Sequence, residues 1–152
     1  MATNREDIAV LNRLIEATID SVDGYGEAAK DVKNPEIKAI FQRRARERQA
    51  ACSSLQSQVK ALGGQPEDEG SMLASMHRMF VNLHSAARAG DLAVLDEVER
   101  GEDHIKAKYE DAINEAGLST TSLAAVQHAY ASVRSAHDEM SRLKHSLHRM
   151  HG

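Results

Sequence analysis

The sequence predicts an all-α protein in which four long helices form two antiparallel pairs, joined by one long crossover connection that carries a further helix. Four segments repeat apolar residues at alternating steps of three and four, which is the spacing of a helix face that packs against partner helices. The chain has two prolines, no tryptophan, three tyrosines and two phenylalanines, a composition poorly suited to strands. A chain of 152 residues is expected to form one domain, residues 1–152. We expect long helices at about residues 4–32, 35–62, 92–116 and 122–150, and a crossover helix at about 71–89.

The first two helices are bounded by strong local signals. Thr3 and Glu6 have the spacing of a capping box, which starts the first helix. Asn34 is expected to cap the second helix and Pro35 to take its first position, while Gly63 and the glycine after it end that helix. Because so few residues join the two helices, they are expected to be antiparallel neighbours.

The segment from Gly63 to Gly90 is too long for a hairpin turn and can span the length of a bundle. Its helical part carries an apolar stripe made of Met72, Met76, Met79, Phe80 and Leu83. Gly90 followed by Asp91 indicates a helix stop and a new N-cap, and Gly117 ends the third long helix. Two antiparallel helix pairs joined by one long crossover form the ferritin-like arrangement.

Three of the predicted apolar stripes place a polar residue where core packing expects an apolar one. These residues are Arg48 on the second helix, Glu102 on the third long helix and His137 on the fourth. Burying a charge is costly unless it is paired or bound to a metal ion. We therefore expect these three side chains to meet inside the bundle.

The two halves of the chain resemble each other around these positions. Thr18 lies seven residues before Tyr25, and Glu102 lies seven residues before Tyr109. Each half is predicted to be a helical hairpin, so this pattern indicates a duplicated pair of helices.

The segment from Gly101 to Ile113 resembles the third bundle helix of the rubrerythrin and ferritin-like superfamily, where a ligand glutamate precedes a tyrosine by one heptad. The order of the segments also resembles an uncharacterised bacterial four-helix-bundle family that is related to this superfamily and known only as a domain of unknown function. Three short motifs carry this second resemblance: Leu11-Asn12-Arg13-Leu14-Ile15-Glu16, Phe41-Gln42-Arg43 and Glu99-Arg100-Gly101-Glu102-Asp103.

The resemblance implies where metal ligands would stand. Metal-binding members use a glutamate on the first and third helices and a Glu-x-x-His motif on the second and fourth. The matching positions here are Thr18, Arg48, Ala51, Glu102, Arg134 and His137, so only Glu102 and His137 keep a ligand residue. An arginine can neutralise a buried carboxylate without metal, which favours an ion-pair network over a di-metal centre. The polar core implied in this way consists of Thr18, Tyr25, Arg48, Glu102, Tyr109, Arg134 and His137.

Three functions stay open at this point. The favoured one is a non-catalytic bundle without a cofactor, used for protein association or in stress physiology. The second is a di-iron-type oxidoreductase or metal-storage protein that binds iron or another divalent metal through Glu102 and His137. The third is surface metal binding by His145, His148 and His151, which recur every third residue.

Charge and composition predict the partners and the compartment. The net charge is −4 and no basic stripe is present, so we expect no nucleic-acid partner. No apolar run is long enough to span a membrane, and the N-terminal residues do not resemble a secretory signal. With the single Cys52, this favours the cytoplasm. The extent of the apolar stripes predicts a homo-oligomer, most simply a dimer. No nucleophile elbow, phosphate-binding glycine loop or Cys-x-x-Cys pair indicates an enzyme.

Overall fold

A computed structural model describes residues 3–70 and 74–151, without the side chains of residues 74–80, 115, 150 and 151. The described chain forms five helices and no strand, which confirms the all-α prediction. The helices are α1 (Asn4–Asp31), α2 (Pro35–Ala61), α3 (Ala74–Ala89), α4 (Asp91–Glu115) and α5 (Thr120–His151). Residues 71–73, which the sequence assigned to the crossover helix, lie outside the described part. None of the described helices combines the length and the hydrophobicity that a membrane crossing requires.

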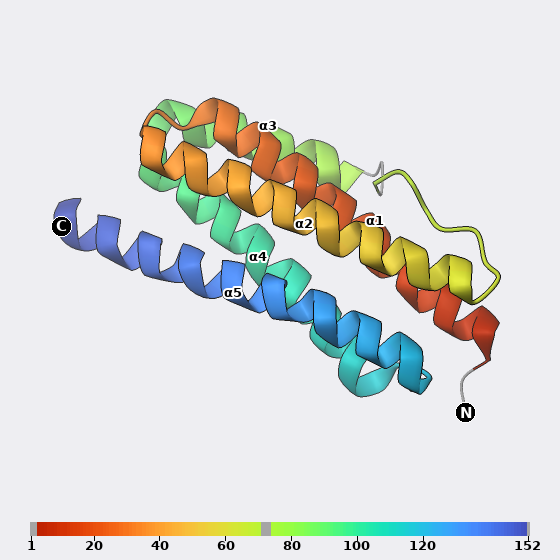
Figure 1. Cartoon of the computed structure of the whole chain (residues 1–152). Helices are drawn as coiled ribbons and strands as arrows, with labels where there is room; N and C mark the ends of the chain where they lie inside the picture. Colours follow the sequence, from red (N-terminus) through yellow and green to blue (C-terminus); the bar gives the residue numbers. More distant parts are fainter. Residues whose placement is uncertain (1–2, 71–73, 152) are drawn as a thin grey trace.

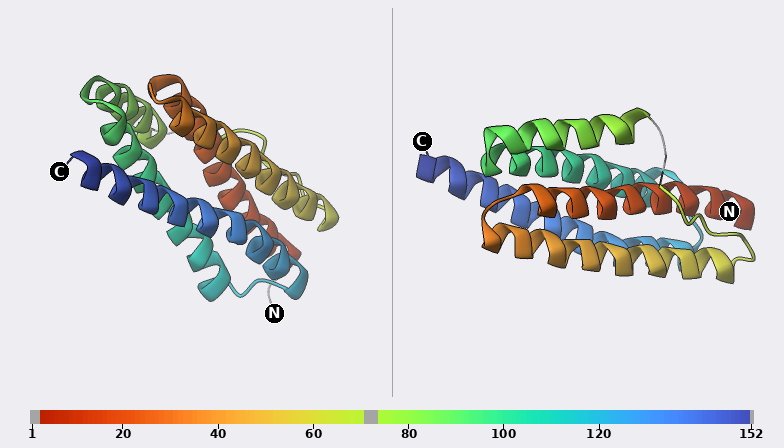
Figure 2. Two further views of the ribbon diagram at one scale, coloured as in Figure 1. Left: turned by 60° about the vertical axis from the view of Figure 1, so that its left-hand side comes forward. Right: turned by 90° about the horizontal axis from the view of Figure 1, so that it is seen from above.

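The four long helices form a bundle of two antiparallel pairs (Figure 1). Helix α1 packs against α2, and α4 packs against α5; the pairs then meet through α1 with α4 and α2 with α5. Helices α2 and α4 therefore lie across a diagonal of the bundle. Helix α3 lies outside the bundle, against α4 and α1 (Figure 2). The crossover containing α3 returns the chain to the end of the bundle at which α1 finished.

Most helix ends follow the local signals in the sequence, with one correction at α4. Thr3 and Glu6 form the expected capping box, and the Asn34 side chain caps α2. Asp91, expected as the N-cap of α4, is instead its first residue, and the N-cap is Gly90. The Asp91 carboxylate accepts hydrogen bonds from the backbone N–H groups of Lys33 and Asn34, each at 2.8 Å. Asp91 thus joins two turns at one end of the bundle, a tertiary contact that competes with local capping.

The interior contains two apolar clusters separated by a polar layer. One cluster lies toward the start of α1 and is formed by residues including Leu11, Ile15, Leu55, Val59, Ile105, Tyr109, Val126 and Val133. The other lies toward the end of α1 and includes Tyr25, Ala29, Ile37, Phe41, Leu83, Val94, Leu95 and Met140. Thr18, Arg48 and Glu102 are the buried polar residues between them. The middle of the bundle is therefore the place where its interior chemistry differs from ordinary apolar packing.

The spacing of residues on the fourth long helix predicts a buried stripe through Val126, Tyr130, Val133, His137 and Met140, and α5 departs from it at two positions. Ala129 and Ala136 are buried, whereas Tyr130 and His137 are only partly buried. A small alanine lets the backbone of α5 approach the neighbouring helices closely, and the larger residue next to it in sequence then lies at the edge of the interface. The predicted stripe is therefore wrong by one residue at each of these two positions, because alanine stands out less than a large side chain in the apolar pattern.

Gly26 on α1 offers a direct test of helix stability. A Cβ atom added there would meet no atom within 4 Å, so alanine fits without displacing any neighbour. Glycine in a helix interior costs about 1 kcal/mol relative to alanine. Gly26→Ala is therefore expected to raise the free energy of unfolding by about 0.5–1 kcal/mol in urea denaturation.

Gly63 is the matched control for this substitution, because its φ of +85° is unfavourable for alanine. Gly63→Ala should lower stability although nothing lies within 4 Å of the added Cβ. Destabilisation by Gly26→Ala would show that α1 is not a regular, well-packed helix at this point.

Candidate functional site

A bidentate ion pair crosses the middle of the bundle. Arg48 on α2 donates from Nη1 to Oε1 of Glu102 and from Nη2 to Oε2 of Glu102, both at 2.8 Å. The two residues are only 1% and 2% exposed. Because α2 and α4 are diagonal partners, the long arginine side chain fills the centre between all four helices. The seam positions of Arg48 and Glu102 predicted this placement.

Helix α1 completes the surroundings of the guanidinium group. The Ser21 hydroxyl accepts a hydrogen bond from Nη1 of Arg48, and the Tyr25 ring centroid lies 5.4 Å from the guanidinium carbon. Ser21 and Tyr25 are four residues apart and so share one face of α1. Burial acts to lower the pKa of Arg48, but the Glu102 carboxylate outweighs it and raises that pKa above the usual arginine value. The Arg48 guanidinium group therefore keeps its charge in the folded protein.

Two tyrosines frame the ion pair in a reciprocal arrangement. The Thr18 hydroxyl donates to the backbone oxygen of Leu14 at 2.6 Å, so it accepts from the Tyr109 hydroxyl at 2.7 Å. Tyr25 on α1 lies near Glu102 on α4, just as Tyr109 on α4 meets Thr18 on α1. The two residues are seven positions apart on each helix, and α1 and α4 are antiparallel neighbours. Each tyrosine therefore lies opposite the first residue of the other pair.

The Tyr25 hydroxyl differs from that of Tyr109 because it has no partner of good hydrogen-bond geometry in the described chain. The tyrosine is 3% exposed. Burial, and then the neighbouring Glu102 carboxylate, raise the pKa of Tyr25 well above its usual value. Its hydroxyl group thus keeps its proton and lies beside the Glu102 carboxylate without a hydrogen bond of good geometry.

Alkaline conditions should destabilise the fold through these interior tyrosines. Burial raises the pKa of Tyr109 from 10.0 to about 12. A raised folded-state pKa contributes stability that is complete below the unfolded-state value and is lost as pH rises between the two. The free energy of unfolding should fall by up to about 1.4 kcal/mol per pH unit for each buried tyrosine above about pH 10. Urea denaturation between about pH 9 and about pH 11 measures this slope.

Tyr109→Phe should reduce the alkaline slope, because the variant has one fewer group that must remain protonated. Equal slopes for the variant and the wild type would show that Tyr109 titrates alike in folded and unfolded chains.

Arg134 and His137 do not join the polar layer, and the prediction that they belong to it is wrong. Arg134 is exposed. The His137 side chain is 20% exposed, and its Nε2 lies 2.6 Å from Oδ1 of Asp103. Successive helix residues point in different directions, so Asp103 faces outward where Glu102 faces inward. His137 follows Asp103 to the edge of the bundle because Ala136 occupies the interior position of α5.

The C-terminal histidines and Cys52 lie outside this layer. His145 and His148 are exposed, and Nε2 of His148 is 3.6 Å from Oδ1 of Asp96; the side chain of His151 is outside the described part. Cys52 is buried in the first apolar cluster, and burial raises the pKa of its thiol. Among the described side chains, no three His, Cys, Asp or Glu residues are grouped so that they could hold a metal ion.

Sequence reasoning missed several polar residues that the structure places at the helix contacts. Ser21 was missed although its spacing of three from Thr18 and four from Tyr25 could have indicated it. Arg44 is 7% exposed, and its Nε and Nη1 donate to Glu139 and Glu47 at 2.7 Å. Asp7 is 1% exposed and accepts hydrogen bonds from the backbone N–H and the hydroxyl of Ser119. Glu139 and Ser119 are more than ninety residues away from Arg44 and Asp7, so no local pattern shows these two contacts.

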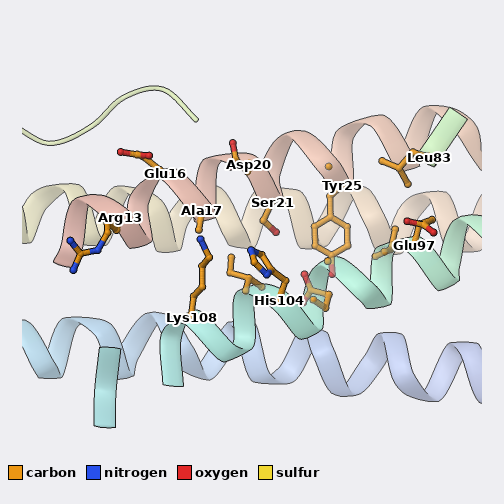
Figure 3. A pocket seen from close by; sticks show the side chains of 15 residues that line it. Arg13, Glu16, Ala17, Asp20, Ser21, Tyr25, Leu83, Glu97, His104 and Lys108 are labelled. Atoms are coloured by element: carbon orange, nitrogen blue, oxygen red, sulfur yellow. The ribbon is translucent and has the colours of Figure 1, made fainter. Parts of the chain in front are cut away.

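A cavity of about 280 Å³ opens between α1 and α4 beside the polar layer. Figure 3 shows the Tyr25 side chain reaching from α1 toward α4, with Ser21 and His104 near it and Lys108 further along α4. Glu102 forms part of the inner wall. Tyr25 and Glu102 thus stand side by side in the wall of a space that a small molecule can enter.

These features define an all-helical bundle with an ion pair at its centre. The chain belongs to the family described as domain of unknown function (DUF2383), whose model matches residues 6–115. This match includes α1, α2, α3 and α4, and therefore both halves of the Arg48–Glu102 pair. No curated protein matches the sequence.

Proposed function

We propose that the protein is a ferritin-like bundle in which a buried ion pair stands in place of a metal centre, and that it acts by association rather than by catalysis. The observation that carries this proposal is the bidentate contact of Arg48 with Glu102. Both carboxylate oxygens of the retained glutamate bind a fixed cation at the position where a metal-binding relative would have a glutamate.

The residues present do not fit a di-metal centre. Ala51 takes the histidine position on α2, Arg134 is exposed, and His137 binds Asp103 at the edge of the bundle. Glu102 is then the one expected ligand inside the polar layer. A single carboxylate beside a guanidinium group is a poor cation site, because the two positive charges repel each other.

Metal analysis tests the first part of the proposal. We expect protein purified without a metal-affinity column to contain far less than one iron, zinc or nickel ion per chain, and its thermal melt to be unchanged by a chelator. About two metal ions per chain, lost with chelator together with stability, would overturn the proposal. Metal that disappears when residues 145–152 are removed would assign the binding to the C-terminal histidines instead.

Sedimentation tests the association. Val81 on α3 is 48% exposed, the one large apolar side chain that is exposed among the described residues. We propose that the outer side of α3 forms a contact with a second copy of the chain. A dimer that Val81→Glu dissociates is the expected result, with Lys60→Glu on the exposed end of α2 as the control. A monomer throughout the accessible concentration range would show that the protein does not associate with itself.

A further inference from the structure

We propose that the cavity between α1 and α4 binds a small uncharged aromatic alcohol of one or two rings. This inference goes beyond the scaffold role, which needs no ligand. It rests on the size of the cavity, the nature of its walls and the unpartnered hydroxyl at its inner end.

The cavity is large enough for such a molecule and has apolar walls. A cavity of about 150 Å³ in another protein binds benzene, and this cavity measures about 280 Å³. Ala17, Leu83, Val98 and Ile105 supply apolar surface, and Gly24 and Gly101 bring the two helix backbones to its edge. Rings therefore find apolar contacts on both helices.

Gly101 is not required by the packing of α4. A Cβ atom added there would meet nothing within 4 Å, although glycine costs helix stability. Because Gly101 lines the cavity, the side chain of any other residue at this position would project into it. The glycine thus keeps open a space that an ordinary helix residue would fill.

The inner end presents one donor and one acceptor. The buried Tyr25 hydroxyl lies beside the Glu102 carboxylate but makes no hydrogen bond of good geometry in the described chain. Each Glu102 oxygen accepts one hydrogen bond from Arg48, which leaves lone pairs for a further donor. A ligand hydroxyl can accept from Tyr25 and donate to Glu102, so one group satisfies both side chains.

The charges select an uncharged ligand. An anion at the inner end would meet the Glu102 carboxylate, and a cation would gain little there because Arg48 already neutralises that carboxylate. The remaining charged side chains around the cavity are of both signs: Arg13, Glu16, Asp20, Glu97 and Lys108. They lie nearer to water, where salt screens them. A neutral hydroxyl group is the chemistry that suits the paired ions.

Titration with 2-naphthol tests this site. The chain contains no tryptophan, so naphthol fluorescence can be followed with little protein background. We expect saturable binding of one molecule per chain and about tenfold weaker binding to Tyr25→Phe, which loses only the hydroxyl. Naphthalene, which lacks the hydroxyl group, should bind equally to wild type and Tyr25→Phe. The anion 2-naphthoate should bind more weakly than 2-naphthol.

Substitutions of glycine locate the binding. Gly101→Leu should abolish binding by filling the cavity, and Gly101→Ala, whose methyl group has open space, should weaken it while the thermal melt shows an intact fold. Gly26→Ala has equal open space but does not line the cavity, so it should bind 2-naphthol like the wild type. Absence of saturable binding to the wild type, or binding unaffected by Tyr25→Phe and Gly101→Ala, would overturn the proposal.

Discussion

Replacing Glu102 by alanine is expected to lower the free energy of unfolding by about 3–5 kcal/mol. The substitution leaves the buried Arg48 guanidinium group without its carboxylate partner, and the Ser21 hydroxyl and the Tyr25 ring remain beside it. An arginine side chain cannot lose its proton to escape burial. Since domains of this size are stable by about 5–15 kcal/mol, the loss is a large part of the total. Urea denaturation in chelator-treated buffer measures it.

The double variant Arg48→Met with Glu102→Leu is the matched control. It removes both charges and keeps most of the side-chain volume, so its stability should be close to that of the wild type or higher. If Glu102→Ala is as stable as the wild type, Glu102 does not stabilise the fold by pairing with Arg48. A double variant as unstable as Glu102→Ala would show that the lost volume, rather than the unpaired charge, causes the damage.

Near neutral pH, Arg48→Met is expected to lower the free energy of unfolding by about as much as Glu102→Ala does. Its loss of stability should also depend on pH, whereas that of Glu102→Ala should not. Without Arg48, the buried carboxylate can avoid its charge by taking up a proton in the folded state. The folded variant then binds a proton that the unfolded chain has released, so its stability relative to the wild type falls as pH rises. The deficit should be smaller at about pH 5 than at about pH 8.

Glu102→Ala supplies the control for this measurement, because all other titrating groups are the same in the two variants. Relative to Glu102→Ala, the Arg48→Met variant should therefore be more stable at about pH 5 than at about pH 8. Parallel pH curves for the two variants would show that Glu102 is solvated or repartnered once Arg48 is removed.

The register of the polar layer could be predicted only where large residues define it. On α2 and α4 the apolar neighbours are bulky, and the stripe passes through Arg48 and Glu102 as the spacing indicates. On α5 two of the interior positions are Ala129 and Ala136, which do not stand out in a pattern of large apolar residues. The spacing therefore predicts interior positions for Arg134 and His137, which the structure places at the surface and at the edge of the bundle. Five of the seven residues predicted for the polar core lie in it.

The cavity and its unpartnered tyrosine were not predictable from residue patterns. Both depend on the distance between α1 and α4 at one level of the bundle, and no sequence spacing states that distance. Gly24 and Gly101 lie on different helices, so their sequence positions do not indicate that they line one cavity. The spare hydroxyl of Tyr25 likewise becomes visible only when every possible partner around it has been located.

The sequence by itself determined the helical class, the extent of the five helices to within a few residues, and the opposite charges that must meet inside. Each of these follows from local propensity, capping residues or the periodicity of apolar side chains, which act along a single helix. The tertiary structure alone decided that Arg48 reaches Glu102 across the diagonal, that His137 turns to the edge and that a cavity remains beside Tyr25. These outcomes depend on how closely neighbouring helices approach, and that distance is set by the small residues at their contacts.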